Sequence, residues 1–168
     1  MKYFTRKWAR GDLDEDTYNR VVSRYEEFLN TLDHSSTVWR FAKSISLNDA
    51  YLDRVAFDRP HGNLKLLLVT GDNQIGYWRT ELSYAGAQII EGEEVLKQAL
   101  AARPTEIWYD EFDRDERGMS HAFLIDPNLD QSSANPGEFR VACERFDFSQ
   151  SPAGRRILST EDNRSVWG

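Results

Sequence analysis

The apolar residues of this chain change their spacing about one third of the way along it. Between Asp14 and Asp33 they recur every three or four positions, as on one face of an α-helix, at Tyr18, Val21, Val22, Tyr25, Phe28, Leu29 and Leu32. From about Leu52 onwards apolar and polar residues alternate, which is typical of half-buried strands. Because the two patterns occupy separate parts of the chain, we predict an α+β fold with N-terminal helices followed by a largely antiparallel β-sheet.

Residues 1–50 are predicted to form the helical part. A second, shorter helix is expected within Thr37–Ser46, and both helices have candidate N-caps, Asp12 or Asp14 for the first and Ser35 or Ser36 for the second. The long helix is expected to pack its apolar stripe against the rest of the molecule through Val21, Val22, Tyr25, Phe28 and Leu29. The chain opens with rings interleaved with cations, a pattern that suits base stacking, but we expect the rings to anchor the N-terminus on the core; they are Tyr3, Phe4 and Trp8.

Residues 51–148 are predicted to form mainly antiparallel sheet, with one helix inserted at 93–102. Leu64–Val69 is apolar on both faces apart from one lysine, which predicts a central strand, and Ile75–Tyr84 alternates as a half-exposed strand does. Three later strands are expected, of which the first two form a hairpin around the turn Arg114–Gly118; they are Ile107–Asp113, Met119–Ile125 and Phe139–Phe148. A loop is expected at 126–137 and an irregular tail at 149–168, all within a single domain of residues 1–168.

Charge and cysteine content limit the classes of function. The 168 residues carry a formal net charge of -7, whose field repels phosphate backbones and anionic lipid, so neither nucleic acid nor a membrane is an expected partner. The single cysteine, Cys143, cannot form an internal disulfide, and the sequence shows no signal-peptide pattern, so the cytoplasm is the expected compartment. Its neighbours in the predicted strand are apolar, which predicts a buried structural thiol rather than a nucleophile.

The hairpin brings several carboxylates near one histidine. If Asp113 pairs with Met119, Glu111 lies directly opposite His121, and Cβ atoms so opposed are about 4.5–5.5 Å apart. We predict that the two side chains form a structural cross-strand pair. Attraction to the ionised carboxylate is then expected to raise the pKa of His121.

The same residues are the strongest candidates for catalysis. Glu111 and His121 can serve as general base and orienter, or as two metal ligands, with Asp110 or Glu138 assisting. No motif specifies a cofactor or a metal: the EF-hand-like start at Asp113 lacks its later ligands, and the glycines 71 and 76 lack the lysine of a phosphate-binding loop. Neither is therefore predicted.

The opening Met1-Lys2-Tyr3-Phe4-Thr5, followed by Trp8, resembles the start of a bacterial family of uncharacterised proteins. Later segments are similar to the family's recurring order of residues, namely Gly71-Asp72-Asn73-Gln74, Gly76-Tyr77, Trp108-Tyr109-Asp110-Glu111-Phe112, His121, Glu138 and Phe146. Members of the family carry a His-Asp pair where this chain has Asn48-Asp49. The resemblance implies an α+β fold and a bacterial source, and it implies no activity.

These observations favour a non-enzymatic binding or protein-interaction protein, for example a toxin-neutralising one, with another protein as its partner. The alternative is a metal-dependent or acid–base hydrolase that uses Glu111 and His121. The two hypotheses differ in a geometric requirement, because catalysis needs the candidate side chains to converge in one pocket. The sequence has no signature of an oligomeric state.

Overall fold

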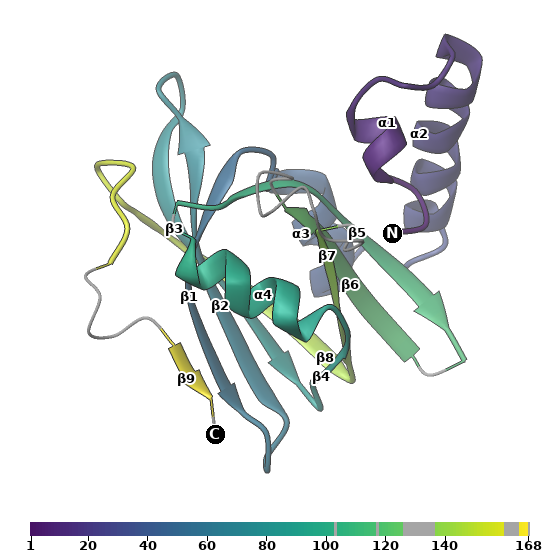
Figure 1. Cartoon of the computed structure of the whole chain (residues 1–168). Helices are drawn as coiled ribbons and strands as arrows, with labels where there is room; N and C mark the ends of the chain where they lie inside the picture. Colours follow the sequence, from purple (N-terminus) through teal and green to yellow (C-terminus); the bar gives the residue numbers. More distant parts are fainter. Residues whose placement is uncertain (103, 117, 126–136, 160–164, 168) are drawn as a thin grey trace.

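The computed structural model describes residues 1–102, 104–116, 118–125, 137–159 and 165–167. Over these residues the chain has the predicted α+β fold, in which N-terminal helices precede a largely antiparallel sheet and one helix is inserted between strands (Figure 1). The predicted loop at 126–137 lies outside the described residues except for Gly137.

The helices of the described chain are α1 (Arg6–Ala9), α2 (Glu15–Asn30), α3 (Thr37–Ser44) and α4 (Glu93–Ala101). Two of them, α2 and α3, begin at a side chain that the sequence predicts as an N-cap. The Asp14 carboxylate accepts a hydrogen bond from the Thr17 backbone N–H at 2.9 Å, and the Ser36 hydroxyl accepts one from the Trp39 backbone N–H at 3.2 Å. Each cap satisfies a backbone donor that has no partner within its helix, which confirms one of the two alternatives for both helices.

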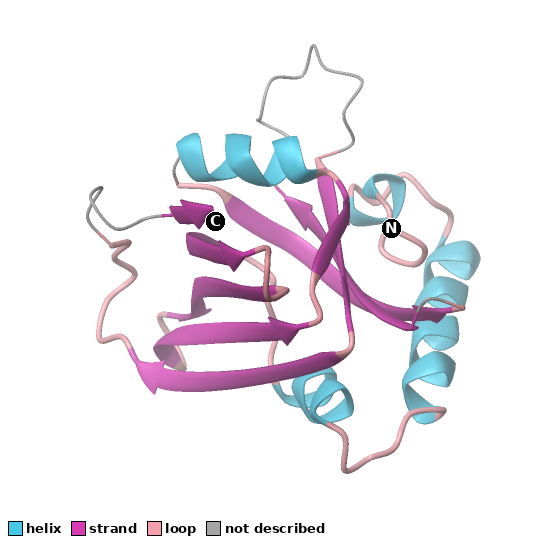
Figure 2. Cartoon of the chain, turned by 90° about the horizontal axis from the view of Figure 1, so that it is seen from below, coloured by secondary structure: helices cyan, strands magenta, loops and turns pink. Residues whose placement is uncertain are grey.

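The stripe of α2 is buried less broadly than predicted. Tyr25 and Leu29 are buried, whereas Val22 is 37% exposed, so the prediction is wrong for Val22. The reason is the position of the helix, which stands at the end of the molecule beside the N-terminal residues rather than across the sheet (Figure 2). Only a narrow face of α2 therefore meets other side chains.

The rings at the start of the chain anchor it, as predicted. Tyr3 is 6% exposed and Trp8 is 5% exposed, and the Tyr3 ring lies 5.1 Å from the Tyr25 ring of α2. Trp8 stacks on Tyr18 at 4.5 Å between ring centroids. Buried rings of this kind contribute apolar area and ring–ring contact to the docking of the N-terminus.

The described strands form one sheet. Its order is β4-β7-β6-β5-β1-β2-β3-β8, with β9 also paired to β1. The strand bounds are β1 (Ala50–Asp58), β2 (Asn63–Asp72), β3 (Gly76–Ala85), β4 (Gln88–Glu91), β5 (Glu106–Asp115), β6 (Gly118–Ile125), β7 (Glu138–Cys143), β8 (Arg145–Pro152) and β9 (Ser165–Trp167). The apolar run of β2 lies between β1 and β3, which confirms it as a central strand.

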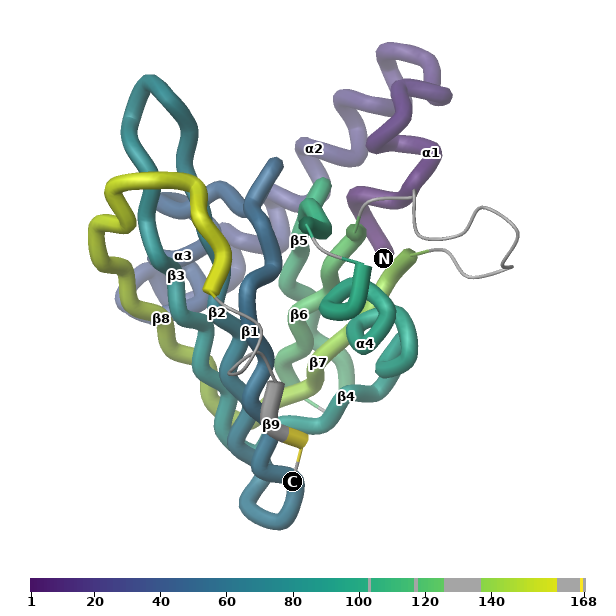
Figure 3. The backbone as a smooth tube through the Cα atoms, turned by 60° about the vertical axis from the view of Figure 1, so that its left-hand side comes forward, coloured from purple at the N-terminus to yellow at the C-terminus, as the bar shows by residue number. Residues whose placement is uncertain are grey.

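The sheet is divided into two halves that meet at a short seam. β1 pairs with β5 only through Ala50 and Tyr51, opposite Ile107 and Glu106. Further along β1, the short β9 pairs with it in parallel at residues 55–57. The strands β1-β2-β3-β8 and β5-β6-β7-β4 consequently form two groups (Figure 3).

The region predicted as the single strand Phe139–Phe148 is two strands, which corrects that prediction. β7 pairs with β6 and β4, and the strand is interrupted at Glu144. β8 then pairs with β3 in the other half of the sheet. The sequence carries a signal for the break that we missed. Phe139, Val141 and Cys143 fall at odd numbers, whereas Phe146 and Phe148 fall at even numbers, and such a change of phase marks an interruption of the pleat.

The C-terminal residues are also more regular than predicted. β8 continues to Pro152, and β9 adds a further strand after it, so the expectation of an irregular tail from residue 149 is wrong for these positions. The four-residue β4 was not predicted either. Both are short strands whose state depends on the strands they pair with.

The helices α3 and α4 connect the two halves of the sheet. α4 contacts β1 and β7, and α3 contacts β8 and β5, so each helix touches a strand from either half. The core between them is continuous and includes Phe41, Leu52, Leu68, Leu96, Phe123 and Phe139.

Candidate functional site

The register of the β5–β6 hairpin separates the two predicted catalytic residues. Glu111 pairs with Ala122, and His121 pairs with Phe112. Because adjacent residues of a strand point to opposite faces, Glu111 and His121 lie on opposite faces of the sheet. The predicted cross-strand pair is therefore wrong.

A shorter turn accounts for the change of register. Asp113 pairs with Ser120 rather than with Met119, and the pairing continues to Asp115 and Gly118. Gly118 has a φ of 118°, which a residue with a Cβ rarely adopts, and this freedom lets β6 begin immediately at the turn. A turn that is shorter than predicted moves every partner in the hairpin by one residue.

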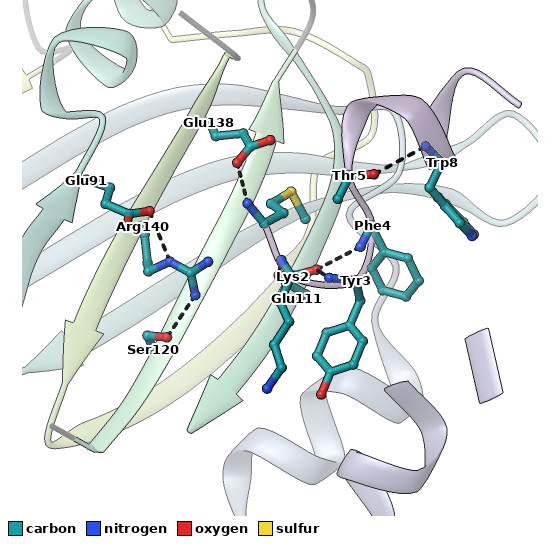
Figure 4. Close-up of polar contacts among 11 residues, drawn as sticks. Lys2, Tyr3, Phe4, Thr5, Trp8, Glu91, Glu111, Ser120, Glu138 and Arg140 are labelled. Carbon is teal, nitrogen blue, oxygen red and sulfur yellow. Dashed lines mark hydrogen bonds and ion pairs between the residues drawn. The ribbon is translucent and has the colours of Figure 1, made fainter. Parts of the chain in front are cut away.

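Glu111 holds the N-terminal segment of the chain (Figure 4). Its carboxylate accepts hydrogen bonds from the backbone N–H groups of Lys2, Tyr3 and Phe4, the last two at 2.8 Å. The Glu111 side chain is buried. A buried carboxylate is costly unless it is hydrogen-bonded, and three backbone donors meet that requirement.

Two more acidic residues, Asp113 of β5 and Glu138 of β7, continue this contact. Glu138 forms an ion pair with the Met1 amino group, and Asp113 accepts a hydrogen bond from the Lys2 ammonium group at 2.8 Å. The hydrogen bond to Asp113 raises the pKa of Lys2. The structure thus brings Glu111 and Glu138 together as receptors for residues 1–4, on the face of the sheet opposite to His121.

His121 belongs to a buried polar chain on the core side of the sheet. Its Nε2 lies 2.9 Å from a carboxylate oxygen of Asp110, and its Nδ1 lies 2.8 Å from the Tyr84 hydroxyl. Ionised Asp110 only accepts, so Nε2 donates to it; in a neutral ring Nδ1 then accepts from Tyr84. Of the predicted residues, the structure therefore brings His121 together with Asp110.

His121 is fully buried among aromatic side chains. The Phe112 and Phe123 rings lie 3.9 and 4.1 Å from the imidazole between centroids, and the imidazole is 0% exposed. Desolvation lowers the pKa of His121 despite the opposing hydrogen bond to Asp110, so the expected increase is wrong in sign. The imidazole is satisfied and inaccessible, which is how a structural histidine is held.

Cys143 is buried, as predicted. The residue is 6% exposed, and burial raises the pKa of its thiol to about 11. A thiol with a raised pKa remains protonated at neutral pH and is a poor nucleophile.

The described chain contains a ligand-sized cleft that none of these residues lines. Its volume is about 510 Å³, and it lies where the inner face of β2, β3 and β8 extends beyond the end of α3. The lining residues come from the α3–β1 connection, from the β2–β3 hairpin and from β8; they are Ser44, Ile45, Ser46, Asn48, Asp49, Thr70, Gly71, Asp72, Ile75, Trp78 and Gln150. The volume falls within the range of small-ligand pockets.

The floor of the cleft is a hydrogen-bonded cluster at the point where the apolar core ends. The hydroxyl oxygens of Thr70 and Thr80 lie 2.7 Å apart, and the Gln150 amide donates to Thr80 at 2.9 Å. Both threonines are at most 2% exposed. Of the two threonines, Thr70 lines the cleft. When the Thr80 hydroxyl donates to Thr70, the Thr70 hydroxyl hydrogen can point to an acceptor that enters the cleft.

The sequence predicts a strand beside this cleft but not the cleft itself. The predicted strand Ile75–Tyr84 corresponds to β3, in which Leu82 and Tyr84 face the core. One signal was available: the inner face of the β2–β3 hairpin changes from leucines to Thr70, Thr80 and Trp78. A polar end to an otherwise apolar sheet face indicates that the core stops there.

Comparison with protein-family models, with curated proteins and with solved structures finds no match to this chain. The family resemblance of the opening segment thus stays a prediction. In the described residues no helix is long and apolar enough to cross a membrane, and no three His, Cys, Asp or Glu side chains are grouped to hold a metal ion.

Proposed function

We propose that this protein is a non-enzymatic binding protein and that the cleft beside Trp78 is its binding site. The observation that carries the proposal is the cleft itself, which combines a ligand-sized volume, an indole and a buried hydroxyl on its floor. Such sites join apolar surface with a few placed polar groups. A protein-interaction role, including toxin neutralisation in a bacterial cytoplasm, is one form of this function, in which a partner's side chain occupies the cleft.

The alternative, a hydrolase that uses Glu111 and His121, has less support. Both side chains would have to reach one substrate, yet they point to opposite faces of the sheet and each is 0% exposed. Each also has its hydrogen-bonding capacity directed at other residues of the protein. Catalysis by this pair would require the hairpin to change its register.

The binding site can be tested by NMR with a library of neutral, anionic and cationic small molecules. We expect binders to shift the indole N–H signal of Trp78 and the side-chain amide signals of Gln150. Trp78→Ala should abolish the shift of the Gln150 amide signals, whereas Tyr77→Ala should retain it, because Tyr77 is adjacent to Trp78 in β3 and points to the other face.

Two results would contradict the proposal. One is a library in which no compound moves the signals of the cleft residues. The other is a set of compounds that bind the Trp78→Ala and Tyr77→Ala variants equally well. If Trp78→Ala does not fold, Ile75→Asn replaces it, because Ile75 lines the cleft and is 70% exposed.

A further inference from the structure

The charged side chains that line the cleft are both acidic. They are Asp49, in the α3–β1 connection, and Asp72, at the end of β2. The Asp72 Oδ1 atom accepts hydrogen bonds from the backbone N–H groups of Gln74 and Ile75, at 2.7 and 3.0 Å, and these bonds lower the pKa of its carboxyl group. Asp72 is consequently ionised at neutral pH, and its other oxygen is available to a ligand.

Arg156 lies near this region, but its guanidinium is engaged by other groups of the protein. Arg156 donates to the backbone carbonyl of Asp49 and to the Glu106 carboxylate, the latter at 3.2 Å, and its guanidinium lies 3.5 Å from the Tyr51 ring centroid. Its charge is thus paired by Glu106 and packed on an aromatic face. Arg156 does not line the cleft, whose own charge is negative.

The apolar part of the lining is suited to the same kind of ligand. Trp78 is half-buried and shares the inner face of the hairpin with Thr70, its partner in the strand register. An indole attracts a cation to its face, and the attraction adds to that of nearby carboxylates. Ile75 supplies exposed aliphatic surface next to the ring, on which a hydrocarbon stem can pack.

We infer that the ligand of the cleft is an organic cation, namely a guanidinium or ammonium group on an aliphatic stem, an inference that rests on the proposed function. The carboxylates of Asp49 and Asp72 pair with the cationic group of the ligand, which also lies against the face of the Trp78 ring. Ile75 contacts the aliphatic stem. The Thr70 hydroxyl donates to a carbonyl or hydroxyl of the same ligand. The chemistry is common to the arginine or lysine side chain of a partner protein and to a free amine.

The test compares two probes that differ in charge and little in shape. Nα-acetyl-arginine amide carries a guanidinium, and Nα-acetyl-citrulline amide replaces it with a neutral urea. We expect the arginine probe to bind about tenfold more tightly at low salt, from one ring contact and two partly exposed carboxylates. Its affinity should fall as salt is raised, because exposed charges are screened.

Variants assign the charge effect to the cleft. Asp49→Asn removes one charge and keeps a residue that tolerates the φ of 61° at this position, so we expect about a threefold loss for the arginine probe and none for citrulline. Glu116→Gln is the matched control, because it removes the same charge from an exposed position in the β5–β6 turn.

The outcomes separate the inference from the proposed function. Equal binding of the two probes, or an Asp49→Asn variant that behaves as Glu116→Gln does, overturns the cationic class. If neutral or anionic library members shift Trp78 while the arginine probe does not, the inference fails and the binding site stands. If nothing shifts Trp78, both fail.

A second pair of probes distinguishes a free amine from a side chain of a partner protein as the ligand of the cleft. Agmatine is a free guanidinium amine, and the capped peptide Gly-Gly-Arg-Gly-Gly presents the same group between two lengths of backbone. Comparable binding of both assigns the cleft to a side chain of a partner protein. Binding of agmatine alone assigns it to a free amine, and binding of neither overturns the inference.

Discussion

At the scale of single residues, Glu111 shows how one carboxylate positions a chain terminus. It accepts three backbone N–H groups from residues 2–4, and it is fully buried. Glu111→Gln retains one acceptor oxygen but places an amide NH₂ group against donors. We expect it to lower the free energy of unfolding by about 1–3 kcal/mol, measured in urea.

The same variant has a local readout. Hydrogen exchange at the amides of Tyr3 and Phe4 should become faster in Glu111→Gln than in the Glu116→Gln control, because their acceptor is weakened. Unchanged exchange at both amides would show that Glu111 does not hold the segment.

His121 gives the protein a defined dependence of stability on pH. Desolvation lowers its pKa in the folded state below the unfolded value of about 6.5. The unfolded state therefore binds more protons below that value. The stabilising effect is complete above about pH 6.5 and is lost as pH falls toward the folded pKa, by up to about 1.4 kcal/mol per pH unit.

The comparison is with His121→Gln, which cannot titrate. Wild type should lose more of its free energy of unfolding between about pH 7 and pH 5.5 than the variant does. His34 and His61 are exposed and remain in both proteins, so they cancel in the difference. Parallel pH profiles for the two proteins would be inconsistent with a neutral, buried imidazole.

At the scale of elements, α2 illustrates the difference between an apolar stripe and a buried one. Leu29 is 1% exposed and Val22 is 37% exposed, although both belong to the same helical face. Leu29→Ala should cost about 2–5 kcal/mol, because it leaves a cavity. Val22→Ala should change stability by less than about 1 kcal/mol.

Thermal or urea unfolding of these two variants checks the packing of the helix. Val22 is the matched position, since it differs from Leu29 in burial and lies on the same element. Equal losses of unfolding free energy in the two variants would contradict the packing of α2 through Leu29 and not through Val22.

At the scale of the whole molecule, the divided sheet raises the question of whether its halves unfold together. They pair directly only through residues 50–51 and 106–107, but α3 and α4 contact both halves and the core is continuous. We therefore expect a single cooperative transition, as small domains usually show.

Fluorine-labelled tryptophan separates the regions in one experiment, because Trp8 reports on α1, Trp78 on β3 and Trp108 on β5. Their signals should disappear at one urea concentration in wild type. Leu96→Ala, in α4, should shift all of them together. Different midpoints for Trp78 and Trp108 would show that the halves are independent units.

The sequence by itself determined the fold class, most helices and strands, and the burial of Cys143, because these depend on local periodicity and on capping groups that lie within a few residues. Asp14 and Ser36 cap their helices without help from distant residues. The strand β2 likewise follows from its own apolar run, and β3 follows from the alternation of its own side chains.

Only the tertiary structure decided the register of the hairpin, the division of the sheet and the position of the cleft. Asp113 pairs with Ser120 instead of Met119, and this one-residue shift of register sent Glu111 and His121 to opposite faces, where distant partners, the N-terminal amides and Tyr84, determine what each does. The cleft joins residues 44–49, 70–78 and 150, which no local pattern relates. It exists because the sheet face extends beyond the helix that covers it, and the relative length of two packed elements is a property of the assembled molecule.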